Sequence, residues 1–123
     1  MTNIRAARLR LMISLNAGDI VWVDFDPVKG TEQSGVRPAI ILSSSEFHKA
    51  GLTAIVCPIT RNRSPWPTKV FLPDGMKTQG CVIAEQIRTV YRLDRGFRFI
   101  ERAPDTVLAD VRTVVAELLG ISS

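Results

Sequence analysis

Polar side chains with the chemistry to handle a phosphate stand at the ends of apolar runs. Arg37 lies where a long polar segment meets the apolar residues 39–42, and Thr60 follows the apolar residues 53–59. A guanidinium offers two forked donors that match a phosphate, and a hydroxyl can donate to a non-bridging oxygen. Glu32, within the polar segment, can accept a proton. This pattern is typical of a site at strand ends beside a loop, whereas each residue alone equally suits an ion pair, a turn cap or a solvated surface.

Several other classes of chemistry lack the residues they need. His48 is the single histidine, so one chain cannot supply a pair of imidazoles for acid–base catalysis, and we expect His48 on the surface. Asp24 and Asp26 would share a strand face that could hold a metal, but we favour a turn opened by Asp26-Pro27. The sequence contains no Gly-Lys-Ser/Thr, Gly-x-Gly-x-x-Gly or Gly-x-Ser-x-Gly motif, which argues against nucleotide-driven and α/β-hydrolase chemistry.

The positive charge of the chain is concentrated in its third quarter. The 123 residues carry a formal charge of +4, and residues 61–102 alone contain nine bases and four acids. Residues 1–16 add three arginines and no acid. A polyanion would bind at this central block and at the N-terminal arm, while an ordinary screened surface is the alternative.

Short strands and one terminal helix are predicted to position these residues. Apolar and β-branched runs bounded by turn residues predict six strands, at residues 20–25, 39–42, 53–59, 69–72, 81–84 and 96–101. A short helical turn is expected over residues 43–49, and the period becomes helical from Pro104 until Gly120. The expected fold class is mainly β, a small antiparallel barrel or sandwich with a C-terminal α-helix packed on it. We expect a single domain over residues 17–123 after a basic extension at 1–16.

The two cysteines favour a reducing compartment. Cys57 and Cys81 each lie inside an apolar stretch, so we expect buried free thiols in a cytoplasmic protein. No apolar run approaches the ~20 residues that a membrane helix needs.

Short motifs follow one another in a recognisable order. They are GDIVWVDFDP at residues 18–27, GTEQ at 30–33, GVRPA at 35–39, CPIT at 57–60, WPT at 66–68 and EQIRT at 85–89. In this order and spacing they closely resemble the MazF/PemK family of toxin endoribonucleases, over about residues 17–119. The resemblance implies an SH3-like β-barrel of the CcdB/MazF type and a homodimer. It also implies sequence-specific, metal-independent cleavage of single-stranded RNA, without a cofactor, and a MazE/PemI-like antitoxin whose disordered segment occupies the RNA groove.

The resemblance also assigns roles to individual residues. It implies that Arg37 and Thr60 act on the scissile phosphate and that the loop glutamate Glu32 takes part, and we assign Glu32 as the base. Some members have a histidine just before the arginine, but Val36 stands there in this chain, so no histidine acts at that position. The expected products are a 2′,3′-cyclic phosphate and a 5′-hydroxyl end, and the cleavage of mRNA would inhibit translation and growth.

Further polar and aromatic residues are expected to bind the RNA. The candidates for reading or stacking unpaired bases are Gln33, Ser34, Trp66, Thr68 and Gln86. Arg61 and Arg63 suit phosphate positioning, with a screened surface as the alternative. Trp66 could instead cover a loop, and Trp22, inside a strand, is expected in the core.

Two other functions remain open at this point. A CcdB-like poison of DNA gyrase would share the fold, but that group acts through a tryptophan near its C-terminus, and the tryptophans here are Trp22 and Trp66. A non-catalytic nucleic-acid-binding barrel would bind through residues 61–102 without turnover.

Overall fold

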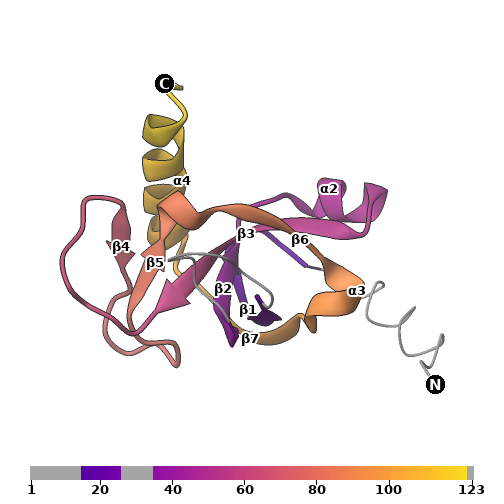
Figure 1. The fold of residues 1–123 in the computed structure, drawn as a ribbon, viewed down its shortest axis with the longest axis horizontal. Coiled ribbons are helices and arrows are strands. Elements are labelled where there is room, and N and C mark those ends of the chain that lie inside the picture. The colour runs from indigo at the N-terminus through magenta and orange to yellow at the C-terminus, as the bar shows by residue number, and fades with distance from the viewer. Residues whose placement is uncertain (1–14, 26–34, 122–123) are drawn as a thin grey trace.

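Strand β3 (Thr53–Thr60) is the centre of an antiparallel sheet in the computed structural model, which describes residues 15–25 and 35–121. One edge of β3 pairs with β2 (Val36–Ile41). The other edge pairs first with β6 (Arg88–Tyr91) and then, at its last two residues, with β5 (Cys81–Ile83). On this edge, the first half of β3 therefore pairs with one strand and its end pairs with another. The sheet bends around β3 (Figure 1).

The outer strands extend this curved sheet without closing it. Strand β2 pairs with β1 (Asp19–Asp24), which pairs in turn with β7 (Arg98–Arg102), and β5 pairs with β4 (Lys69–Phe71). A register shift between Ile20 and Val21 adds to the bend, as β-bulges do. Within the described residues, no pairing joins β7 to β4 or β6. The mainly β class with a terminal helix is confirmed, but the barrel is open at this point.

The C-terminal helix α4 (Asp105–Leu118) was predicted, and its end shows why it stops there. Gly120 adopts a φ of +72°, its N–H donates to the carbonyl of Glu117, and the N–H of Ile121 donates to that of Ala116. This is the Schellman arrangement, in which a left-handed glycine satisfies the last carbonyls of a helix. None of the helices in the described ranges is long and apolar enough to span a membrane.

The shorter elements were only partly anticipated. The expected turn is the helix α2 (Ser45–Ala50), capped by the Ser44 side chain, which accepts from the N–H of Phe47. Strand β6, the 3₁₀ turn η1 (Ala84–Gln86) and helix α3 (Arg92–Arg95) were missed. Residues 84–95 switch conformation every three or four residues, which is too short for either periodicity to show.

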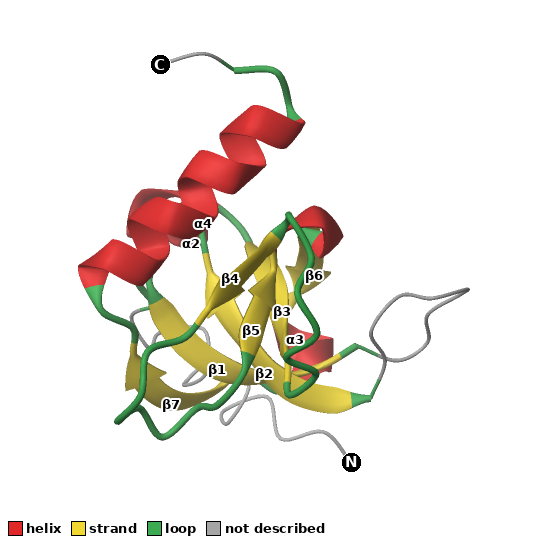
Figure 2. Ribbon diagram, turned by 90° about the vertical axis from the view of Figure 1, so that its left-hand side faces the viewer, coloured by secondary structure: helices red, strands yellow, loops and turns green. Residues whose placement is uncertain are grey.

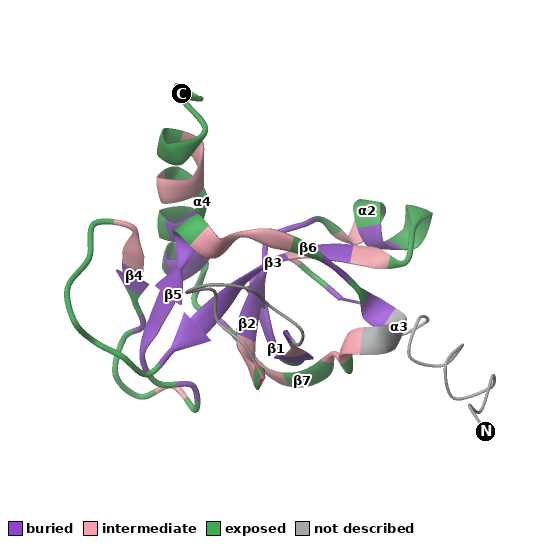
Figure 3. Cartoon of the chain, in the orientation of Figure 1, coloured by how far each residue is buried: buried purple, intermediate pink, exposed green. Residues whose placement is uncertain are grey.

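The two faces of the sheet carry separate hydrophobic clusters, because successive strand residues point to opposite sides. Ile20 and Ile40 face α4, whereas Val21 and Val56 belong to the cluster on the other face. Helix α4 covers the first face with a stripe at helical spacing, formed by Val107, Leu108 and Val111. Figure 2 shows α4 running obliquely at one end of the strands, and Figure 3 shows the buried residues concentrated in the central strands.

The single histidine is buried, so its expected place on the surface was wrong. His48 Nδ1 lies 2.8 Å from the carbonyl oxygen of Leu15, and Nε2 lies 2.6 Å from Ser43 Oγ. A carbonyl only accepts, so Nδ1 carries a hydrogen, and in the neutral ring Nε2 then accepts from the serine hydroxyl. Ser43 Oγ also accepts from the N–H of Ile55, and Arg92 donates to the carbonyl of His48. A short α2 can therefore bury a polar ring because all its hydrogen-bonding atoms are satisfied.

Both cysteines are buried and unpaired, as predicted. Burial raises the pKa of Cys57 to about 12, so its thiol stays protonated at neutral pH. Its Sγ donates weakly to the carbonyl of Ala84 at 3.8 Å. Cys57 therefore serves as a small apolar side chain of the α4-facing cluster.

Candidate functional site

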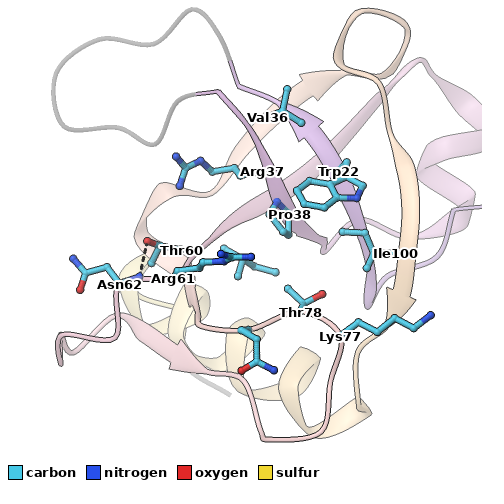
Figure 4. Close-up of a pocket in the computed structure, with 12 residues that line it drawn as sticks. Trp22, Val36, Arg37, Pro38, Thr60, Arg61, Asn62, Lys77, Thr78 and Ile100 are labelled. Carbon is cyan, nitrogen blue, oxygen red and sulfur yellow. Dashed lines mark hydrogen bonds between the residues drawn. The ribbon is translucent and has the colours of Figure 1, made fainter.

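The face of the sheet that α4 covers continues beyond the helix and is open there. Ile20 pairs with Ile40 in the covered part, and two residues along the same strands Trp22 pairs with Pro38. Trp22 is 36% exposed. Together with Ile100 of β7, Trp22 and Pro38 form an apolar floor in a pocket of about 460 Å³ (Figure 4). The pocket is thus the uncovered end of a core-forming surface.

Strands β2 and β3 bring Arg37 and Thr60 to this pocket. Arg37 is near the start of β2, and Thr60 ends the antiparallel neighbour β3, so both residues lie at one end of the sheet. Both line the pocket; Thr60 is buried and Arg37 is partly buried. Figure 4 shows their side chains on the same side of the opening. The structure therefore brings together the two residues that the sequence singled out for phosphate chemistry.

The hydroxyl of Thr60 is held in place by the loop that follows it. The N–H of Asn62 donates to Thr60 Oγ1 at 3.1 Å, and the N–H of Ser64 donates to Asn62 Oδ1 at 2.9 Å. Lys69 Nζ donates to the carbonyls of Asn62 and Ser64 at 3.1 and 2.9 Å. Thr60 therefore does take the turn-capping role left open above. A hydroxyl that accepts one hydrogen bond still has its own hydrogen to donate, so the two roles are compatible.

A second pocket, of about 250 Å³, adjoins the first and shares Thr60 and Asn62 with it. It offers an exposed indole, a carboxylate and an amide, from Trp66, Glu85 and Gln86. The hydroxyl of Thr68 donates to Glu85 Oε1 at 2.9 Å and so holds one oxygen of this carboxylate. An indole for stacking beside hydrogen-bonding groups is an arrangement suited to an unpaired base.

The loop before β5 forms another wall of the first pocket, from Lys77, Thr78 and Gln79. The N–H of Lys77 donates to Glu101 Oε1 at 3.2 Å. The N–H and the hydroxyl of Thr78 donate to Glu101 Oε2 at 2.6 and 2.7 Å. Burial raises the pKa of Glu101, but these hydrogen bonds and the charge of Lys77 outweigh it, so the pKa lies below its ordinary value. The loop is therefore bound to an ionised carboxylate.

The charge of the first pocket suits an anion. Its described lining includes the cations Arg37, Arg61 and Lys77 and no carboxylate. Across residues 15–25 and 35–121, no group of three histidine, cysteine or acidic side chains is placed to hold a metal ion. Guanidinium, ammonium and hydroxyl donors that line one cavity can bind a phosphate and stabilise added negative charge on it.

The remaining candidates from the sequence fall in several places. Arg61 lines the first pocket, Trp66 and Gln86 line the second, and Thr68 reaches the second through Glu85. Arg63 lies outside both linings, with its guanidinium carbon 5.3 Å from the ring centroid of Phe71. Three candidates lie outside the described residues, namely Glu32, Gln33 and Ser34.

Sequence reasoning missed one floor residue and one wall of the pocket. The core position expected for Trp22 was wrong, because its face of β1 is uncovered at that point. Lys77, Thr78 and Gln79 were read only as part of a connection between strands. The charge pattern held a signal for Lys77, which belongs to the basic block at residues 61–102. Trp22 lies on the same face of β1 as Ile20, two residues before it, and α4 covers Ile20 but not Trp22. The sequence alone carried no signal of where this cover ends.

The fold and the site can be compared with known proteins. Residues 16–119 match the model of the family described as PemK-like, MazF-like toxin of type II toxin-antitoxin system. The endoribonuclease toxin MazF of Escherichia coli K12 is 37% identical over 79 residues, which are 64% of this chain and 70% of that protein.

Solved structures agree with this match. MazF from Deinococcus radiodurans is 34% identical with a TM-score of 0.84, over 88% of this chain and 98% of that one. A chain of a MazE–MazF structure from the same organism is 35% identical with a TM-score of 0.79, over 89% and 98% of the two chains. With its open, basic pocket at the strand ends, this chain belongs to the family of PemK-like, MazF-like toxins of type II toxin–antitoxin systems.

Proposed function

We propose that this endoribonuclease toxin cuts single-stranded RNA, mRNA included, without a metal, at a phosphate bound between Arg37 and Thr60. The observation that carries the proposal is that these two residues line one pocket, in which Arg61 and Lys77 are the other charged groups among the described residues. A cavity lined by hydrogen-bond donors and cations would stabilise the extra negative charge of the pentavalent phosphate, as a metal would otherwise do.

The chemistry is an internal transfer at phosphorus. The ribose 2′-oxygen loses its proton to a base and bonds to the adjacent phosphorus, while the bond to the 5′-oxygen breaks and that oxygen takes up a proton. The products are a 2′,3′-cyclic phosphate and a 5′-hydroxyl end. Arg37 donates from its guanidinium to the non-bridging oxygens, and Thr60 donates its hydroxyl hydrogen. Glu32 is our candidate for the base.

The two connected pockets would hold the RNA on either side of this phosphate. Arg61 positions the backbone in the first pocket, and Trp66 stacks on an unpaired base at the second. Gln86 offers an amide to a base edge. The further candidates for contacts with the RNA are Arg63, Thr68, Gln33 and Ser34. Recognition of several unpaired bases would make the cleavage sequence-specific.

We also propose a homodimer, an antitoxin and a cytoplasmic site of action. An apolar groove of about 260 Å³ runs between the end of α4 and the sheet, and Leu119 and Ile121 beside it are 64% and 60% exposed. Exposed apolar surface of this kind is typical of a protein contact, and we assign it to a second copy of the chain.

A MazE/PemI-like antitoxin would place an extended segment in the RNA pockets and block them. Because we propose mRNA as the substrate of the toxin, we also propose that the toxin acts in the cytoplasm.

The test is cleavage of a long single-stranded RNA by the purified protein in excess EDTA, with every new 5′ end mapped. We expect discrete cuts that share a short sequence, carry 5′-hydroxyl ends and disappear in Arg37→Ala. Lys49→Ala is the matched control, because it also removes one positive charge, from an exposed residue of α2 that lines neither pocket. Full activity of Arg37→Ala would overturn the mechanism. RNA that is bound but never cut would favour the non-catalytic barrel, and an unaffected RNA with inhibited gyrase would favour the CcdB-like alternative.

A further inference from the structure

Glu101 lies outside the pocket linings yet holds one of the pocket walls. It sits on β7 and accepts three hydrogen bonds from the loop that carries Lys77 and Thr78, all at 3.2 Å or less. Two of these donors are backbone N–H groups. The contact therefore fixes the path of the chain as well as one side chain. It joins residues that lie 23 and 24 positions apart in the sequence.

The other end of this loop packs closely against the end of β3. Gly80 adopts a φ of +117°, and a Cβ added there would lie 2.0 Å from the carbonyl oxygen of Thr60. The carbonyl of Gly80 also accepts from the N–H of Leu72 at 2.9 Å. The loop of residues 77–80 therefore contacts Thr60, the last residue of β3, at one end and the Glu101 carboxylate of β7 at the other. Its position is coupled to the backbone of Thr60, which is a candidate catalytic residue.

We propose that Glu101 is a positioning residue for RNA binding, which holds Lys77 and Gln79 where they contact the RNA. The inference rests on the function proposed above, since it gives the loop a role toward the same substrate. A loop that is fixed before binding loses less conformational entropy when the RNA arrives, so the same contacts yield a higher affinity. Glu101 acts through the loop, because the lining of the pocket contains the loop residues and not the carboxylate.

The direction in which RNA binding changes in a Glu101 variant separates this positioning role from simple charge repulsion. A carboxylate near a pocket for a polyanion repels the substrate, so loss of its charge alone would strengthen RNA binding. Loss of the loop contact would weaken binding instead. Glu101→Gln keeps the shape of the side chain but replaces one acceptor oxygen with an N–H donor, which faces a loop donor. The two explanations therefore predict opposite changes in KM for this variant.

A second variant tests the contact without changing any charge. Thr78→Val keeps the volume of a buried side chain and removes only the hydroxyl that donates to Glu101. For each variant, KM and kcat for a short RNA substrate would be measured together with hydrogen exchange of the Lys77 and Thr78 amides. Glu46→Gln serves as the control, because it removes an exposed carboxylate from α2, outside both pockets.

We expect KM to rise about two- to tenfold in both variants, the net contribution of one ordinary hydrogen bond, with kcat within about twofold of the parent. The two amides should exchange faster, and Glu46→Gln should behave like the parent protein. An unchanged or lower KM in both variants would overturn the positioning role, as would unchanged amide exchange. If the parent protein itself does not cut RNA, the proposed function fails, while amide exchange still reports whether Glu101 holds the loop. If Glu101→Gln does not fold, Thr78→Val decides the question.

Discussion

Strand β3 has a polar cluster near each of its ends, one closed to solvent and one open. Near its start, Ser43, His48 and Arg92 are all buried and bind one another or nearby carbonyls. At its end, Thr60 and Arg37 line a pocket that opens to solvent. The closed cluster satisfies its hydrogen bonds within the protein, so it stabilises the fold. The open cluster directs cations and a hydroxyl at a cavity, so it is suited to a ligand. Burial of a polar group is therefore no guide to function unless its partners are known.

The comparison predicts that the open cluster controls activity and leaves stability nearly unchanged. Arg37→Ala should lower the rate of RNA cleavage by about 10²–10³-fold, as loss of a group that stabilises a transition-state charge does. Arg37→Lys should recover only part of this rate, because an ammonium keeps the charge without the forked donors. Initial rates under single-turnover conditions, with the melting temperature of each variant, would check this. A melting temperature that falls in step with the rate would remove the distinction between the two clusters.

Gly80 should be the position where stability and activity change together. In Gly80→Ala, the new Cβ would have to displace the carbonyl of Thr60, and the backbone would keep a φ that alanine disfavours. We expect a loss of about 1–3 kcal/mol in the free energy of unfolding, with reduced cleavage in the protein that remains folded. Gly75→Ala is the matched control, because Gly75 also has a positive φ but nothing within 4 Å of an added Cβ. Urea unfolding and RNA cleavage of both variants would be compared, and equal effects would argue against the close contact.

The closed cluster should behave in the opposite way to Arg37. His48→Leu keeps much of the volume but leaves the Leu15 carbonyl and the Ser43 hydroxyl buried without their partner. We expect a loss of about 1–3 kcal/mol of stability, with kcat unchanged for the folded fraction. Equilibrium unfolding in urea, followed by cleavage assays well below the transition, would measure both quantities. Lys49→Ala, at the exposed neighbouring residue, should change neither, and a large loss of kcat in His48→Leu would link the two clusters.

Acid should weaken the contact between Glu101 and the loop that carries Lys77 and Thr78. We expect this to be the smallest effect among the four predictions. Because the pKa of Glu101 is lowered in the folded state, its contribution to stability is present above the ordinary value of 4.5. That contribution is lost as the pH falls through the folded pKa. The difference in unfolding free energy between the parent protein and Glu101→Gln should therefore shrink between pH 6 and pH 3. Urea titrations at the two pH values would measure it, and a difference that grows on acidification would contradict the assignment.

Local patterns in the sequence predicted most of the fold, and they singled out Arg37 and Thr60, which line the same pocket in the structure. The strand runs and the helical stripe carry their own periodicity, and Arg37 and Thr60 stand next to such runs, so their convergence followed from antiparallel pairing. The position of Trp22 did not follow, because it depends on where α4 stops covering the sheet. Glu101 was missed for a similar reason, since its partners lie 23 and 24 residues away and only the completed sheet brings them together. The burial of His48 likewise needs Leu15 and Ser43 in place.

Because the pocket depends on the pairing of β1 with β7, it forms late when the chain folds. Asp19 lies opposite Arg102, so this pairing must close a loop of most of the chain, and such distant pairings form slowly. Trp22 and Ile100 approach each other only through it. During synthesis from the N-terminus, β1, β2 and β3 emerge well before β7, so a nascent chain has Arg37 and Thr60 without the complete pocket. The pocket that contains Arg37 and Thr60 is therefore complete only after β7 has been made and has paired with β1.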